Sequence, residues 1–237
     1  AVTWTDVKVM GLTVFVLVAA VVVLVMGLPP NVGMGTALDV AGVTGRVDAF
    51  DFRFDLSQTY TFWSGLLGGL FLMLSYFGCD QSQVQRYLRA KWVDEGRHSL
   101  LMSAYWKIPL QVIVLLVGVL VFVYYTFNPA PLIFSGEAES RVRNGADGAA
   151  YRTLESEYET GFRARRDAAI ELANARDGDN AARVTTAQSA VRDREAELQT
   201  IRTKATSLVR SVEGDQSYTH VNYIIPTFIL TRLPIGL

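Results

Sequence analysis

The chain has 237 residues; half of them are hydrophobic and only 19% are charged. The net charge is −1 and no basic run occurs, which excludes the electrostatic signature of a nucleic-acid-binding protein. A single cysteine, Cys79, excludes an internal disulfide, and no Cys-x-x-Cys motif or His/Cys cluster predicts a zinc site.

The charges are concentrated in one part of the chain. Among the 79 residues from Glu137 to Asp215, 28 are charged, against 17 of the other 158. This contrast predicts two kinds of sequence in one chain, an apolar part at 1–135 and a charged insert at 136–215. A third, more apolar segment follows at 216–237.

Three apolar runs in the first part predict membrane-spanning helices at about 7–28, 62–79 and 106–127. The first holds 20 residues without a charge, from Val9 to Leu28, enough to cross about 30 Å of hydrocarbon. The second, Phe62 to Cys79, is at the lower length limit, and the third runs uncharged from Ile108 to Phe127. The sequence therefore predicts an all-α membrane protein.

The distribution of Lys and Arg predicts the orientation of these helices. The connection at 81–107 carries five Lys and Arg residues, whereas the connection at 29–61 carries two, together with four aspartates. Because Lys and Arg are enriched in cytoplasmic loops, we expect the 81–107 connection in the cytoplasm. The charged insert is then extracytoplasmic.

The charged insert has the apolar spacing of two amphipathic helices. Its apolar residues recur three and four positions apart on each side of the turn sequence at 177–180, although Arg194 occupies an expected apolar position. This pattern predicts an antiparallel coiled-coil hairpin that folds independently and stands off the membrane. Its mixed charges fit a solvated face or, alternatively, a docking surface for a partner protein.

Four motifs, in order, resemble the sodium:solute symporter family. The motif that begins at Gly78 is the most specific, since it continues into Val84-Gln85-Arg86 and Ala90-Lys91. The resemblance covers about 1–135 and 216–237, and the insert lies outside it. The motifs are Trp4-Thr5-Asp6, Gly78-Cys79-Asp80-Gln81, Tyr105-Trp106-Lys107-Ile108-Pro109 and Asn222-Tyr223-Ile224-Ile225-Pro226-Thr227-Phe228.

This resemblance implies a leucine-transporter-like inverted-repeat bundle, with solute and ions bound near the middle of the membrane. The chain would supply the fifth, sixth and seventh core helices and the extracellular loop before the eighth. Segment 216–237 would then be a loop leading to the next, missing core helix. Because the chain starts at Ala1 and ends in an apolar segment, we expect a piece of a longer protein.

The family reading implies a role for Asp6 in the pathway of the coupling ion, Na⁺. A carboxylate inside a membrane costs about 2.5–3.5 kcal/mol at the helix centre, so it needs a cation or a donor as a partner. The alternative is an aspartate that stays hydrated at the cytoplasmic end of the helix. The principal sodium site of the family lies on helices outside this chain.

The same resemblance implies solute contacts for Lys107, Tyr76, Phe77 and Ser75. Lys107 matches a lysine that donates hydrogen bonds to the solute in sugar-carrying members, Tyr76 matches an inner gate, and Phe77 matches a stacking platform. The alternatives are a lysine that extends to the lipid headgroups and aromatic residues that only pack against other helices. Asp80, Gln81 and Arg86 are interpreted as structural or gating residues.

No catalytic or metal-binding constellation is present in the sequence, so we expect no enzyme. The sequence predicts sodium-coupled symport of a small polar solute across the plasma or inner membrane by alternating access. The solute class stays open among sugars, polyols, amino acids and carboxylates. The alternative function is a transporter-like membrane sensor or scaffold whose coiled-coil insert binds a partner protein.

Overall fold

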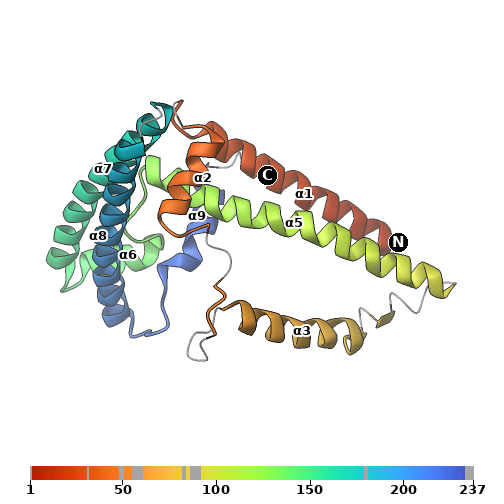
Figure 1. The fold of residues 1–237 in the computed structure, drawn as a ribbon. Helices are drawn as coiled ribbons and strands as arrows, with labels where there is room; N and C mark the ends of the chain where they lie inside the picture. Colours follow the sequence, from red (N-terminus) through yellow and green to blue (C-terminus); the bar gives the residue numbers. More distant parts are fainter. Residues whose placement is uncertain are drawn as a thin grey trace. The chain divides into compact units, whose positions relative to one another are not determined.

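The computed structural model describes residues 2–30, 32–47, 51–54, 61–81, 84–85, 92–178 and 181–232, which form helices and no strand. The chain divides into two compact units, residues 1–47 with 115–237, and residues 48–114. The helices of Figure 1 are α1 (Val2–Met26), α2 (Met34–Val43), α3 (Phe62–Gly78), α5 (Val93–Phe127), α6 (Gly136–Asn144), α7 (Gly148–Asp177), α8 (Ala181–Glu213), a 3-10 helix (His220–Tyr223) and α9 (Ile224–Arg232).

Two of the described helices are long and apolar enough to cross a membrane, α1 over Val7–Met26 and α5 over Val93–Phe127. The 17 residues of α3 give a length of about 25 Å, slightly short of the hydrocarbon thickness. Side chains such as Phe15 and Leu70 are more than half exposed. A helix that is apolar on every side needs lipid or other apolar helices around it.

In the first unit, α1 packs against the second half of α5 (Figure 1). Leu24 is fully buried among Leu120, Tyr124 and Phe228 of α9. Gly27 allows this approach, because a Cβ at that position would lie 2.5 Å from Cε2 of Tyr124. The α1–α5 contact therefore requires a residue without a side chain at the end of α1.

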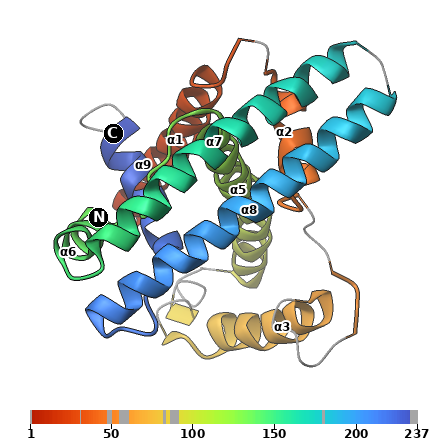
Figure 2. The same cartoon turned by 90° about the vertical axis from the view of Figure 1, so that its left-hand side faces the viewer.

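The helices α7 and α8 lie side by side (Figure 2), and their contacts show that they are antiparallel. Arg165 pairs with Glu195, whereas Glu171, further along α7, pairs with Arg183, nearer the start of α8. The apolar periodicity predicted two helices here, and two helices are present. Arg194 occupies a position where the apolar spacing predicted a buried residue. In the structure Arg194 is exposed, and its neighbour Glu195 is buried instead.

The hairpin of α7 and α8 also contacts helices outside the charged insert. An ion pair of 3.1 Å joins Arg176 of α7 to Asp39 of α2. The far end of the hairpin also shares a core with α2 and the end of α5, because apolar side chains from all of them are buried together. That core consists of Val32, Ala37, Val40, Ala41, Val123, Phe127, Ala169, Leu172, Ala173, Ala187 and Val191.

The base of the hairpin has a core of its own, to which α6 and the segment after α5 contribute. Ser135 accepts a hydrogen bond from the N–H of Ala138 and so caps the start of α6. Ala138 and Val142 of this helix are buried against the hairpin. The base is therefore fixed to the chain that leaves α5.

Three connections contain helices that the sequence analysis did not predict. The 29–61 connection holds α2, and the 81–107 connection holds the first 15 residues of α5, which passes through Pro109 without ending. Segment 216–237 is not a loop throughout, because it holds the 3-10 helix and α9. Asp94 and Glu95 lie in the first turn of α5, where acidic side chains stabilise a helix.

In the second unit, local hydrogen bonds fix the start of α3. The backbone N–H of Thr61 donates to Oγ of Ser64, and the N–H of Ser64 donates to Oγ1 of Thr61, which forms a capping box. The indole N–H of Trp63 donates to the carbonyl of Phe52 at 3.1 Å. These contacts set where α3 begins.

Candidate functional site

The last turn of α3 and the middle of α5 bring together three of the residues that the family resemblance singles out. The Nζ atom of Lys107 lies 5.0 Å from the ring centroid of Tyr76 and 4.9 Å from that of Phe77. The two rings are 5.1 Å apart and nearly perpendicular. Because an aromatic face is electron-rich, both rings attract the ammonium group.

Lys107 is exposed and forms no ion pair with an acidic side chain in the described part of the chain. Its two aromatic neighbours stabilise the positive charge without neutralising it. An ammonium has three N–H donors, so it can still donate hydrogen bonds to an incoming anion or hydroxyl. The arrangement is therefore able to hold a small ligand rich in oxygen or carrying negative charge.

The structure does not bring Ser75 into this group. Its side chain is exposed, and its carbonyl accepts hydrogen bonds from the N–H groups of Cys79 and Asp80, which end α3. Within the residues that the structure describes, no hydrogen bond joins Ser75 to Lys107. Ser75 therefore shapes the helix end that carries Tyr76 and Phe77.

The remaining predicted residues are placed only in part. Asp80 is half-buried just after α3, and Gln81 is exposed. The backbone of Asp6 lies in the second turn of α1, but its side chain lies outside the description, as does the whole of Arg86. The described residues contain no group of three acidic, His or Cys side chains that could hold a metal ion.

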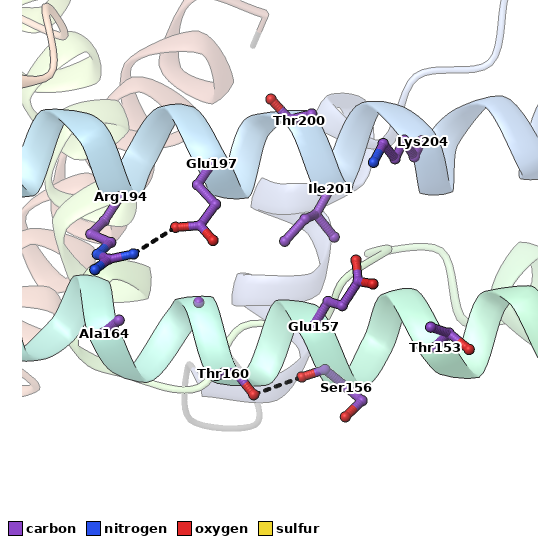
Figure 3. Close-up of a pocket in the computed structure, with 11 residues that line it drawn as sticks. Thr153, Ser156, Glu157, Thr160, Ala164, Arg194, Glu197, Thr200, Ile201 and Lys204 are labelled. Carbon is purple, nitrogen blue, oxygen red and sulfur yellow. Dashed lines mark hydrogen bonds and ion pairs between the residues drawn. The ribbon is translucent and has the colours of Figure 1, made fainter.

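A groove lies between α7 and α8 on the hairpin (Figure 3). Its volume is about 610 Å³, and its lining combines hydroxyl groups with charges of both signs. Arg194 and Glu197 pair with each other across 2.9 Å. The opposite charges compensate each other here, as expected of a solvated helix face. The lining residues are Thr153, Ser156, Glu157, Thr160, Gly161, Ala164, Arg194, Glu197, Thr200, Ile201 and Lys204.

A buried ion pair in the hairpin escaped the sequence analysis. Arg165 and Glu195 are 4% and 9% exposed, and the distance from Nη1 to Oε2 is 2.7 Å. The sequence contained a signal, because both residues fall within the apolar three-four spacing of their helices and have opposite charges. The pair also binds the end of α5, since Nη2 of Arg165 donates to the carbonyl of Tyr125 at 2.8 Å.

Two ionisable groups at the base of the hairpin, His220 and Tyr218, stay neutral because they are buried. Burial, assisted by the nearby charge of Arg202, lowers the pKa of His220 to about 4. Burial raises the pKa of Tyr218 to about 12. Neither group changes its charge near neutral pH, so this region is not suited to carrying protons.

Comparison with known proteins identifies sodium-dependent transporters as relatives. The chain is 33% identical to the sodium-dependent multivitamin transporter of Oryctolagus cuniculus over 133 residues, 54% of this chain and 20% of the relative. It is 34% identical to the human sodium/iodide cotransporter over 128 residues, 53% and 19% of the two chains. For human sodium-coupled monocarboxylate transporter 1 the values are 36% over 105 residues, 44% and 16%.

The chain thus spans a fifth or less of the length of these relatives. No family model and no solved structure matches it. The relatives are transporters rather than enzymes, and they do not favour the alternative of a sensor or scaffold. The apolar helices and these matches support a membrane location, and the matches agree with the resemblance to the sodium:solute symporter family that the four motifs carry.

Proposed function

We propose that this chain is part of a sodium-coupled symporter that moves a small solute across the plasma or inner membrane by alternating access. The observation that carries the proposal is the placement of the Lys107 ammonium on the rings of Tyr76 and Phe77. These residues come from two different apolar helices, α3 and α5. A charged group between such helices is an expected feature of a solute pathway.

The solute class that this geometry favours is a small anion. The ammonium of Lys107 is not neutralised by an ion pair among the described residues, so an anion can pair with it. Two of the relatives are named for iodide and for monocarboxylates, both of which are anions. A neutral sugar would gain hydrogen bonds from the same ammonium but would leave its charge unpaired.

The coupling ion is Na⁺, as in the relatives named for their dependence on sodium. Asp6 at the start of α1 remains our candidate for its pathway, with the principal ligands on helices outside this chain. Asp80, Gln81 and Arg86 remain candidates for the cytoplasmic gate. The excess of Lys and Arg at 81–107 supports an extracytoplasmic position for the hairpin.

Uptake by the full-length carrier in proteoliposomes tests this proposal. We expect an inward sodium gradient to drive uptake of iodide or a short monocarboxylate, and an equal potassium gradient not to do so. Hydrogen bonds to a charged group contribute about 1.5–3 kcal/mol, so Lys107→Gln should raise the KM for the anion by roughly tenfold to a hundredfold. Lys107→Arg, which keeps the charge, should retain part of the affinity.

Lys204→Gln is the matched control, because Lys204 is a lysine on the exposed face of α8. We expect this variant to transport as the unchanged carrier does. Uptake that proceeds equally in potassium would overturn the sodium coupling. An unchanged KM in Lys107→Gln would remove Lys107 from the solute site.

A further inference from the structure

The last turn of α5 has carbonyl groups without partners within the helix. The last four carbonyls of any helix need a hydrogen-bond donor from outside the helix. For Tyr124, Asn128 supplies two donors, its backbone N–H at 2.8 Å and its side-chain amide at 3.1 Å. For Tyr125, the donor is Nη2 of Arg165, which lies 40 residues later in α7.

Arg165 is held in place by contacts on both of its other sides. Nη1 donates to Oε2 of Glu195 in α8, and Nε2 of Gln199 donates to the other carboxylate oxygen of Glu195 at 3.1 Å. The guanidinium also lies 5.4 Å from the ring centroid of Phe162. A planar guanidinium can serve two acceptors at once, which an ammonium does less well. Arg165 thus joins α7, α8 and the end of α5.

The end of α1 meets the same place. The side-chain amide of Asn128 donates to the carbonyl of Gly27 at 3.0 Å as well as to that of Tyr124. The rings of Tyr124 and Tyr125 are 5.4 Å apart, and each packs against Phe228 of α9. The ends of both spanning helices and the hairpin are therefore joined by hydrogen bonds within a few residues.

From this geometry we infer that Arg165 is a latch that makes the hairpin and the end of α5 move as one body. The functional part of this inference rests on the proposed transport activity, because alternating access requires core helices to move relative to one another. The ion pair with Glu195 fixes the guanidinium within the hairpin, so moving the end of α5 away would leave the carbonyl of Tyr125 and Nη2 of Arg165 without their hydrogen bond. Any movement of the end of α5 must then carry the hairpin with it.

The experiment removes the latch and keeps the hairpin. Arg165→Met together with Glu195→Leu replaces the buried pair by apolar side chains of similar size, a change that proteins often tolerate. Arg165→Lys is the second variant, because it keeps the charge beside Glu195 but shortens the reach to Tyr125. The matched control is Arg183→Met with Glu171→Leu, an exposed pair on the same two helices.

The first readout is hydrogen exchange in the full-length carrier. We expect the amides in the last turn of α5 to exchange about fivefold faster or more without the latch, while those of α7 and α8 stay protected. The control pair should change neither region. Unchanged exchange at the end of α5 in both the double variant and Arg165→Lys would overturn the latch, whatever the transport assay shows.

The second readout separates the latch from the proposed function. We expect the maximal rate of sodium-driven uptake to change about threefold or more in the latch variants, while equilibrium binding of the anion stays within about twofold. An equal change in binding would overturn a purely conformational role. A carrier without sodium-driven uptake would contradict the proposed function, and hydrogen exchange would still decide whether Arg165 holds α5.

Discussion

The hairpin and the second unit satisfy the hydrophobic effect in opposite ways. In the hairpin, the apolar stripes of α7 and α8 are covered by each other, by α2 and by α6, so that Leu172 and Leu198 are at most 2% exposed. In α3, none of the described side chains is buried, and Leu70 is 53% exposed. The charged helices thus form a packed protein core, whereas the apolar helix has an uncovered surface suited to lipid or to further helices.

The largest expected effect concerns the side of the membrane on which each region lies. In a carrier whose other cysteines are replaced, we expect Ser189→Cys in the hairpin to react fully with a membrane-impermeant maleimide added outside intact cells. Ser99→Cys, in the first half of α5, should react only after the cells are opened. Both serines are exposed, so accessibility within the protein does not limit either reaction. The reverse labelling pattern would refute the orientation drawn from Lys and Arg.

A smaller effect should distinguish a covered leucine from an uncovered one. Leu198→Ala leaves a cavity beside Gly161 and should lower the free energy of unfolding by about 2–5 kcal/mol, because the site is closely packed. Leu70→Ala, the same change on α3, should cost far less in detergent or lipid. Thermal unfolding of the purified protein measures both. A large loss at Leu70 would show that protein, not lipid, covers α3, and no loss at Leu198 would contradict the packed hairpin.

The smallest effect is a dependence of hairpin stability on pH. The pKa of His220 is lowered from its ordinary value of 6.5 to about 4, mainly by burial and then by Arg202. The folded state therefore binds fewer protons than the unfolded state between these values, so stability is highest above pH 6.5 and falls as the pH drops towards 4. Melting temperatures measured across this range should show the fall, and His220→Gln should flatten it. An equal slope in both proteins would assign the effect to other groups.

The sequence analysis predicted helix type better than helix extent. Uncharged runs identified the spanning parts of α1 and α5, but Asp94, Glu95 and Arg97 made the first turns of α5 look like a loop. The structure continues the helix through them, because acidic side chains are favourable at a helix start and the apolar requirement applies only inside the membrane. For α2 a signal existed, since its buried residues Ala37, Val40 and Ala41 are three and four positions apart.

The candidate site was predicted in part, and through resemblance rather than through spacing. The motif residues Tyr76, Phe77 and Lys107 lie together, although 29 residues lie between Phe77 and Lys107 in the sequence. Ser75 is a neighbour in sequence and is not part of the group. Adjacent residues of a helix point about 100° apart, so proximity in the sequence does not ensure proximity at a site.

The amino-acid sequence by itself determined which segments are apolar enough to span a membrane and which form amphipathic helices, because hydropathy and a period of 3.6 residues are local properties. Only the tertiary structure decided that Arg165 caps a helix 40 residues earlier and that the hairpin packs on α2. These features depend on which surfaces meet after folding. The spacing of residues along one helix does not specify its partner, so they could not be derived from it.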